Sequence, residues 1–150
     1  MEPREFLKLA STLVTQSQPA QIRTAISRAY YAVFNTAAQF LADLGFPLPR
    51  AGVHVAVQHR LQNCADLKIK RIGSELTDLH TKRIQADYRL SQKSIEGQRT
   101  ALTVISQADR MMQALENCIA DEPRRRVVVK AINEWLVLTG QSGFTSDQSK

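Results

Sequence analysis

The sequence is poor in the residues that interrupt helices or hold small folds together. Its 150 residues include 6 glycines, 5 prolines and 2 cysteines, and aromatic residues make up 6%. So few turn-forming residues argue against a fold of many short strands. The two cysteines, Cys64 and Cys118, are too few for a disulfide framework and lack the spacing of a metal site, so we interpret both as buried thiols.

Long hydrophobic runs are also missing. No segment approaches the roughly 20 consecutive apolar residues that a membrane-spanning helix needs, and no signal-peptide pattern stands at the N-terminus. We therefore expect a cytoplasmic protein that does not contact a membrane. The length fits one domain with an apolar core, and the abundance of alanine, leucine, glutamine and arginine favours helices.

Apolar residues recur at helical intervals along most of the chain. They predict helices over residues 3–16, 19–44, 67–90, 94–120 and 124–138. Residues 51–65 are ambiguous. Val53, Val55 and Val57 alternate as in a strand, but Val53, Val57 and Leu61 also keep helical spacing. We predict a helix there, since no second strand is available to pair with it.

Helices joined by short connections pack most simply as an antiparallel, up-down bundle. The sequence therefore predicts an all-α fold: a bundle of four to five helices, followed by a C-terminal helix and a frayed tail. Residues 1–122 would form the bundle, residues 123–140 a basic C-terminal helix that docks on a partner, and residues 141–150 a disordered tail.

One cation interrupts the apolar pattern of segment 67–90. Arg83 stands in helical register with the apolar residues Ile69, Ile72, Leu76, Leu79, Ala86 and Leu90. An arginine on a packed helix face must pair with an acid, reach solvent or serve a site, because burying an unpaired charge is very unfavourable. The candidate acids are Asp87, one turn along the helix, and Asp109 or Glu116 on a later helix.

Positive charge exceeds negative charge in this chain, with a formal net charge of +6. The predicted helix over residues 67–90 carries a first basic cluster, which consists of Lys68, Lys70, Arg71, Lys82 and Arg83. The start of the last predicted helix carries a second, which consists of Arg124, Arg125 and Arg126. Each cluster is either a solvated helix face or a surface that follows a nucleic-acid backbone.

Two short motifs resemble a known protein family. Residues 27–34 read Ser-Arg-Ala-Tyr-Tyr-Ala-Val-Phe, and residues 83–88 read Arg-Ile-Gln-Ala-Asp-Tyr. In this order they resemble the motifs of small stand-alone members of the HEPN superfamily. The resemblance implies a helical bundle, usually a homodimer with a groove along its two-fold contact. It also implies links to RNA cleavage, nucleotide binding, toxin-antitoxin pairs and antiviral defence.

The chain departs from the ribonuclease members of that family. Their arginine is followed by a polar residue and, four to six positions after the arginine, by a histidine. Here Ile84 follows Arg83, and no histidine stands at that spacing. Metal-independent RNA cleavage needs groups that move protons near neutral pH, as histidine does. The remaining candidates for catalysis are Arg83, His80, which lies one helical turn before Arg83, and Tyr88.

The resemblance places both motifs along one groove. Its candidate residues for binding RNA or a nucleotide are Arg28, Tyr31, Lys82, Arg83, Asp87 and Tyr88. Tyr30 and Tyr31 point about 100° apart on a helix, so one ring can enter the core while the other faces a neighbouring helix or subunit. We expect no cofactor and no metal site, because His54 and His59 are five residues apart and no acid or cysteine completes a ligand set.

Three functions stay open at this point. The first is a non-catalytic or weakly catalytic dimeric HEPN module that binds RNA, a nucleotide or a protein partner in a toxin-antitoxin or antiviral defence system. The second is a metal-independent endoribonuclease toxin with a displaced general acid or base. The third is a structural subunit of a larger complex, docked through residues 127–138. The partners implied are a second copy of the chain and a nucleotidyltransferase, an antitoxin or a defence-complex protein.

Overall fold

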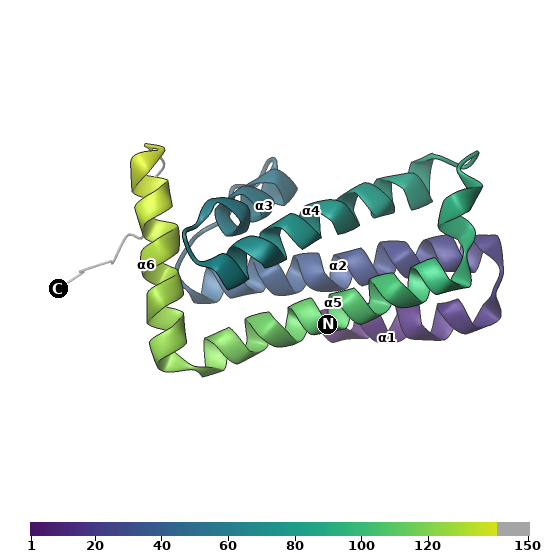
Figure 1. The fold of residues 1–150 in the computed structure, drawn as a ribbon, viewed down its shortest axis with the longest axis horizontal. Helices are drawn as coiled ribbons and strands as arrows, with labels where there is room; N and C mark the ends of the chain where they lie inside the picture. The colour runs from purple at the N-terminus through teal and green to yellow at the C-terminus, as the bar shows by residue number, and fades with distance from the viewer. Residues whose placement is uncertain (141–150) are drawn as a thin grey trace. The chain divides into compact units, whose positions relative to one another are not determined.

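The computed structural model describes residues 1–140, which are helical throughout apart from the connecting segments (Figure 1). Six α-helices and two short 3₁₀ helices follow one another as α1 (Pro3–Leu13), η1 (Val14–Gln16), α2 (Pro19–Asp43), α3 (Val53–Asn63), α4 (Leu67–Tyr88), η2 (Lys93–Glu96), α5 (Gln98–Ala120) and α6 (Glu122–Leu138). Residues 1–140 contain no strand. The predicted all-α class is confirmed, with five helices followed by a C-terminal helix. The predicted tail, residues 141–150, lies outside the described residues.

Local signals in the sequence set where the helices begin and end. Gly45 ends α2 with a backbone φ of +88°, a conformation that glycine adopts without the steric penalty of a side chain. Its N–H donates to the carbonyl of Ala42 at 2.9 Å, and the N–H of Phe46 donates to the carbonyl of Leu41 at 2.9 Å. This double hydrogen bond satisfies carbonyls that the helix end leaves without partners.

A proline separates α5 from α6, as the sequence predicts. Pro123 lies in the first turn of α6, where its missing N–H is not needed by the helix. The side chain of Asp121 caps this end by accepting a hydrogen bond from the backbone N–H of Arg124 at 3.2 Å. These two residues mark the boundary between α5 and α6.

The chain forms two compact units. Of the described residues, the first unit comprises 1–36 and 75–114, and the second comprises 37–74 and 115–140. The division into domains expected from the sequence, with a boundary near residue 122, stays a prediction.

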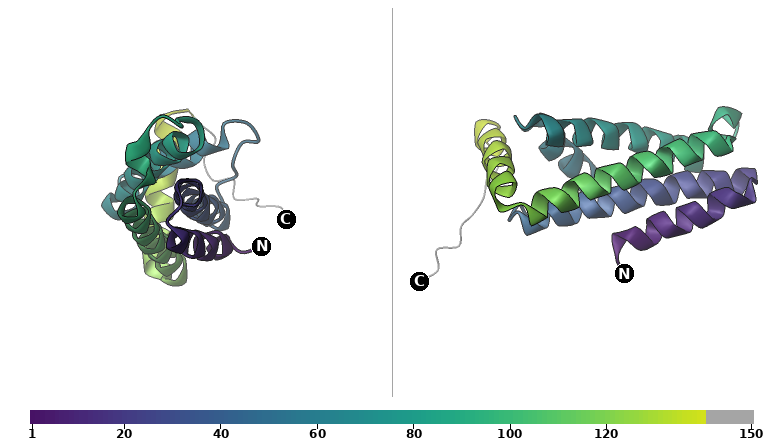
Figure 2. Two further views of the ribbon diagram at one scale, coloured as in Figure 1. Left: turned by 90° about the vertical axis from the view of Figure 1, so that its right-hand side faces the viewer. Right: turned by 60° about the horizontal axis from the view of Figure 1, so that its bottom comes forward.

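In the first unit, successive helical segments run in opposite directions, as expected for an up-down bundle (Figures 1 and 2). These segments are α1, the first part of α2, the last part of α4 and the first part of α5. Their facing side chains are fully or almost fully buried and include Ile22, Ile26, Tyr30, Leu76, Leu79, Val104 and Met111. This apolar core fixes the positions of the polar side chains that α1, α2 and α4 carry beside it.

In the second unit, α6 packs against α3, and α3 also approaches the first turns of α4 closely. A Cβ atom at Gly73 would lie 2.4 Å from the backbone nitrogen of Gln62, so only glycine allows this approach. Val57 and Leu61 are buried whereas Val55 is exposed, which confirms the helical register of residues 51–65 over the alternating one. Both cysteines are buried free thiols, as predicted.

None of the helices in residues 1–140 is both long enough and apolar enough to cross a membrane.

Candidate functional site around Arg28 and Arg83

Arg83 pairs with an acid on its own helix. Its side chain is 16% exposed, and its Nε atom lies 2.9 Å from Oδ2 of Asp87, one turn further along α4. Its Nη2 atom donates a hydrogen bond of 2.7 Å to the hydroxyl of Tyr31 on α2. Of the acids that the sequence offered, Asp87 is therefore the partner, and Asp109 instead forms an ion pair with Arg4 of α1 at 2.9 Å.

The apolar register around Arg83 is confirmed except at its end. Ile69, Ile72, Leu76, Leu79 and Ala86 are buried. Leu90 was wrong as a core residue, because α4 ends at Tyr88 and the Leu90 side chain is 72% exposed. Arg83 thus occupies the last core-facing turn of α4 before the chain leaves the helix.

Asp87 joins the two sequence motifs. The hydroxyl of Ser27, a buried residue of α2, donates a hydrogen bond of 3.1 Å to Oδ2 of Asp87. The same oxygen faces the Arg83 guanidinium. The segment 27–34 and the segment 83–88, which are far apart in sequence, therefore meet through a shared carboxylate in the first unit.

The two adjacent tyrosines divide between core and surface, as predicted. Tyr30 is fully buried, and its ring centroid lies 6.0 Å from that of Phe34 and 5.2 Å from that of His80. Tyr31 is half-buried and faces α1, where its ring centroid lies 6.3 Å from that of Phe6. The Tyr31 hydroxyl therefore belongs to the polar cluster, whereas Tyr30 belongs to the core.

Arg28 lies on aromatic rings rather than beside an acid. Its guanidinium carbon is 5.2 Å from the ring centroid of Tyr31 and 5.6 Å from that of Phe6. Its Nε atom is buried and has no hydrogen-bond partner, and within residues 1–140 the side chain forms no ion pair. The electron-rich ring faces attract the cation, but within the described residues no carboxylate forms an ion pair with it.

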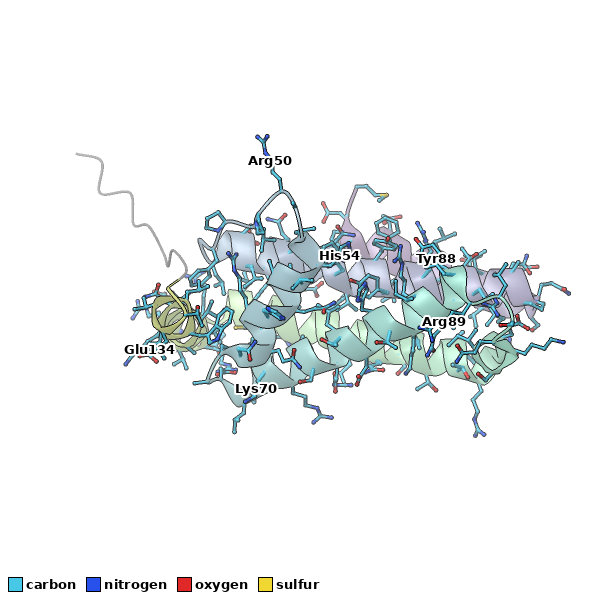
Figure 3. The ribbon with its side chains drawn as sticks, turned by 90° about the horizontal axis from the view of Figure 1, so that it is seen from above. Arg50, His54, Lys70, Tyr88, Arg89 and Glu134 are labelled. Carbon is cyan, nitrogen blue, oxygen red and sulfur yellow. The ribbon has the colours of Figure 1, made fainter. Side chains whose placement is uncertain are left out.

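Arg83 also contacts two aromatic rings. Its guanidinium carbon lies 5.3 Å from the ring centroids of both Tyr31 and Tyr88. Tyr88 is 67% exposed and stands with Arg89 at the end of α4 (Figure 3). Two arginines thus share the ring of Tyr31, and a second tyrosine continues the aromatic surface into solvent.

The structure brings together most of the predicted binding residues. Arg28, Tyr31, Arg83, Asp87 and Tyr88 form one cluster in the first unit, which we call the arginine–tyrosine cluster. Lys82 is half-buried and makes no ion pair with any of them. Phe6 and Ser27 complete the cluster.

The local environment shifts two pKa values in this region. Burial acts to lower the pKa of Arg83, but the acidic groups of Tyr31, Asp87 and Tyr88 together raise it above its ordinary value. Burial lowers the pKa of His80, and the nearby charge of Arg83 lowers it further. Arg83 therefore stays a cation, and for His80 the neutral form of the imidazole is favoured.

The histidines offer little for metal binding. His59 is exposed, and His54 on α3 is half-buried (Figure 3). Within residues 1–140, no group of three or more histidine, cysteine, aspartate or glutamate side chains is arranged to hold a metal ion.

Sequence reasoning missed Arg23, a buried arginine of the first unit. Its Nη2 atom lies 2.8 Å from Oε1 of Glu96 in η2. Its guanidinium also donates hydrogen bonds of 3.0–3.3 Å to backbone carbonyls at the end of α4 and in the following turn, those of Gln85, Ala86, Arg89, Leu90 and Gln92. Arg23 therefore fixes the chain on both sides of Tyr88.

A weak signal for Arg23 was present in the sequence. The only acidic residue of α2 is Asp43, at its far end, so neither Arg23 nor Arg28 has an acid within one or two helical turns. An arginine on such a helix must find its partners elsewhere. Arg23 finds them in backbone carbonyls, which no residue pattern reveals, and Arg28 finds aromatic rings.

Comparison with known proteins gave no match. No family model matches this chain, and neither a curated protein nor a solved structure is significantly similar to it.

Proposed function

We propose that the chain is a HEPN-like module that binds single-stranded RNA through the arginine–tyrosine cluster and has little or no ribonuclease activity. The observation that carries the proposal is Arg28, a cation held on the rings of Tyr31 and Phe6 that forms no ion pair within residues 1–140. A phosphate group would supply the missing counter-charge and charge-assisted hydrogen bonds.

Arg28 and Arg83 have different parts in this proposal. Asp87 already balances the charge of Arg83, so a phosphate that bound to Arg83 would compete with a carboxylate. Arg28 has no such competitor among the residues that the structure describes. We therefore assign the main phosphate contact to Arg28, and we assign to Arg83 the placement of Tyr31 through its hydrogen bond of 2.7 Å.

Tyr88 suits a base of the same RNA strand. Its ring is largely exposed and lies over the Arg83 guanidinium. Proteins that bind single-stranded nucleic acid combine cations for the backbone with aromatic rings on which bases stack. Stacking of this kind tolerates any base, so we expect weak sequence preference.

The weak or absent catalysis follows from the titratable groups. RNA cleavage without a metal needs one group to accept the 2′-hydroxyl proton and another to protonate the leaving oxygen. His80 is the only histidine in the first unit, and its ring packs against the buried Tyr30. Its lowered pKa disfavours the protonated form that a general acid needs, and no second histidine lies in the first unit to act with it.

The meeting of both motifs at Asp87 supports the HEPN-like assignment. The assignment also implies the oligomeric state and the partners of that family. These are a homodimer, and a toxin-antitoxin or defence system in which the partner is a nucleotidyltransferase, an antitoxin or a defence-complex protein. This oligomeric state and these partners are part of the proposal.

An RNA-binding reaction followed on a native gel for complex formation and on a denaturing gel for strand length separates binding from cleavage. Purified protein is mixed with an end-labelled RNA containing single-stranded loops, and complex formation and strand length are measured on the same samples. We expect a shifted complex with intact RNA. Cleavage that disappears in the Arg83→Ala variant would instead establish the endoribonuclease function.

A further inference from the structure

α6 exposes a stripe of side chains that the second unit does not cover. Val127, Lys130, Glu134, Val137 and Leu138 follow one another at steps of three, four, three and one residues, which places them on one side of the helix. The apolar side chains of this stripe are largely exposed, at 56% for Val127, 63% for Val137 and 85% for Leu138. The opposite side of α6, with Val128, Ile132 and Leu136, is buried.

The stripe is complementary to itself. If two α6 helices lie antiparallel around a two-fold axis near residue 132, position 127 faces position 137 and position 130 faces position 134. Val127 then meets Val137, and Lys130 meets Glu134, each pair occurring twice. A two-fold interface requires this kind of pairing, because the same surface patch is used on both subunits.

We propose that α6 forms a two-fold, antiparallel contact with α6 of a second copy of this chain. The two ends of the contact bury the exposed valines, and its centre joins each Lys130 to Glu134 of the other copy. This contact takes the place of the groove-lined two-fold contact that the resemblance implies, and it lies on α6 in the second unit rather than at the arginine–tyrosine cluster in the first.

The charged residues at the centre are available for such a contact. Within one chain, Lys130 and Glu134 lie 3.9 Å apart, and their side chains are 80% and 58% exposed. An exposed pair of this geometry contributes little to stability, so exchanging it for pairs across the interface costs little. Figure 3 labels Glu134 at the periphery of α6.

A groove beside the stripe gives the second copy room to enter. It measures about 660 Å³ and is lined by Ala65, Asp66, Leu67, Lys68, Arg124, Val127, Lys130, Ala131 and Glu134. Leu67, at 80% exposed, is the most exposed large apolar side chain on its wall. In the proposed register, Val137 of the second copy enters this groove beside Val127.

A second copy fits this surface better than an acidic or a basic partner. The stripe contains one cation and one anion, and the ion pair of Asp66 with Arg124 on the groove wall is already complete. A strongly charged partner would meet a like charge, which is unfavourable at an interface. The α6 of another copy offers both charges in reversed order together with apolar side chains.

Charge reversal tests the proposed pairing. The oligomeric state of the full chain is measured by sedimentation equilibrium over a range of concentrations for the wild type, Lys130→Glu and Glu134→Lys. We expect a wild-type dimer and, for each variant, a dissociation constant about tenfold higher or more, because like charges then face each other. Lys8→Glu, which reverses a charge of an exposed ion pair on α1, should leave the dimer unchanged.

Mixing the two variants provides the decisive comparison. The Lys130→Glu chain carries two acids at positions 130 and 134, and the Glu134→Lys chain carries two lysines, so only the mixture places opposite charges across the contact. We expect the mixed chains to form heterodimers, which also shows that both variants are folded. A monomeric wild type, or a dimer that neither reversal weakens, would overturn the proposal.

Discussion

Arg83 of α4 donates a hydrogen bond of 2.7 Å to the hydroxyl of Tyr31 on α2, and its guanidinium also lies over the ring of that tyrosine. Tyr31 thus contacts Arg83 through its hydroxyl and Arg28 through its ring. The geometry holds two cations near one aromatic side chain, and of the two only Arg83 forms an ion pair within residues 1–140. This unequal balance of charge is the basis of the proposed phosphate site.

Asp87→Ala should destabilise the protein by about 1–3 kcal/mol, because it removes the half-buried carboxylate that pairs with Arg83 and accepts the hydrogen bond of Ser27. Chemical denaturation measures the change in the free energy of unfolding. In the Arg83→Met background the same substitution should cost less, since the unpaired cation is gone. Equal costs in both backgrounds would contradict the coupling between Arg83 and Asp87.

Arg23→Met should reduce the free energy of unfolding by about 3 kcal/mol or more, because Glu96 would stay partly buried without its cation. The backbone carbonyls at the end of α4 would also lose their donor. Hydrogen exchange should report faster opening near residues 89–92. Arg99→Met, which removes an exposed arginine from α5, serves as the matched control and should change the stability little.

The stability of the fold should decrease as the pH falls below about 6.5 through protonation of His80. Burial, and secondarily Arg83, lower the pKa of His80 in the folded state, so the unfolded chain binds the proton more readily. The contribution of His80 is therefore complete above pH 6.5 and is lost as the pH falls through the folded-state pKa. His80→Phe should flatten the pH dependence of unfolding below about pH 6.5. The same pH dependence of unfolding in the wild type and in His80→Phe would contradict this role of His80.

The sequence was sufficient to predict the helices and part of the site. Apolar periodicity located α1 to α6, and the four-residue spacing of Arg83 and Asp87 pointed to their ion pair. Leu90 was misplaced in the core because periodicity alone does not show where a helix ends. The contacts of Arg23 could not be predicted, since they depend on how a turn 60 to 70 residues away is folded.

The basic residues that the sequence grouped together have different environments. Lys68, Lys70 and Arg71 are exposed in the second unit, whereas Lys82 and Arg83 are half-buried in the first. Arg124 is half-buried and forms an ion pair with Asp66. The hydrogen bond from Arg124 is the main cause that lowers the pKa of the Asp66 carboxyl. Counting charges along the chain therefore overstated the basic surface, because it ignored which cations are already paired.

Fluorescence anisotropy of a labelled single-stranded RNA tests the central claim most directly, with Arg28→Ala compared against Arg99→Ala. Both variants remove one arginine of the first unit, but only Arg28 stands on the rings of Tyr31 and Phe6. We predict that Arg28→Ala raises the dissociation constant about tenfold and lowers the salt dependence of binding by about one unit, while Arg99→Ala stays near the wild type. Equal affinities for the wild type and Arg28→Ala, or no binding by the wild type, would contradict the proposed function.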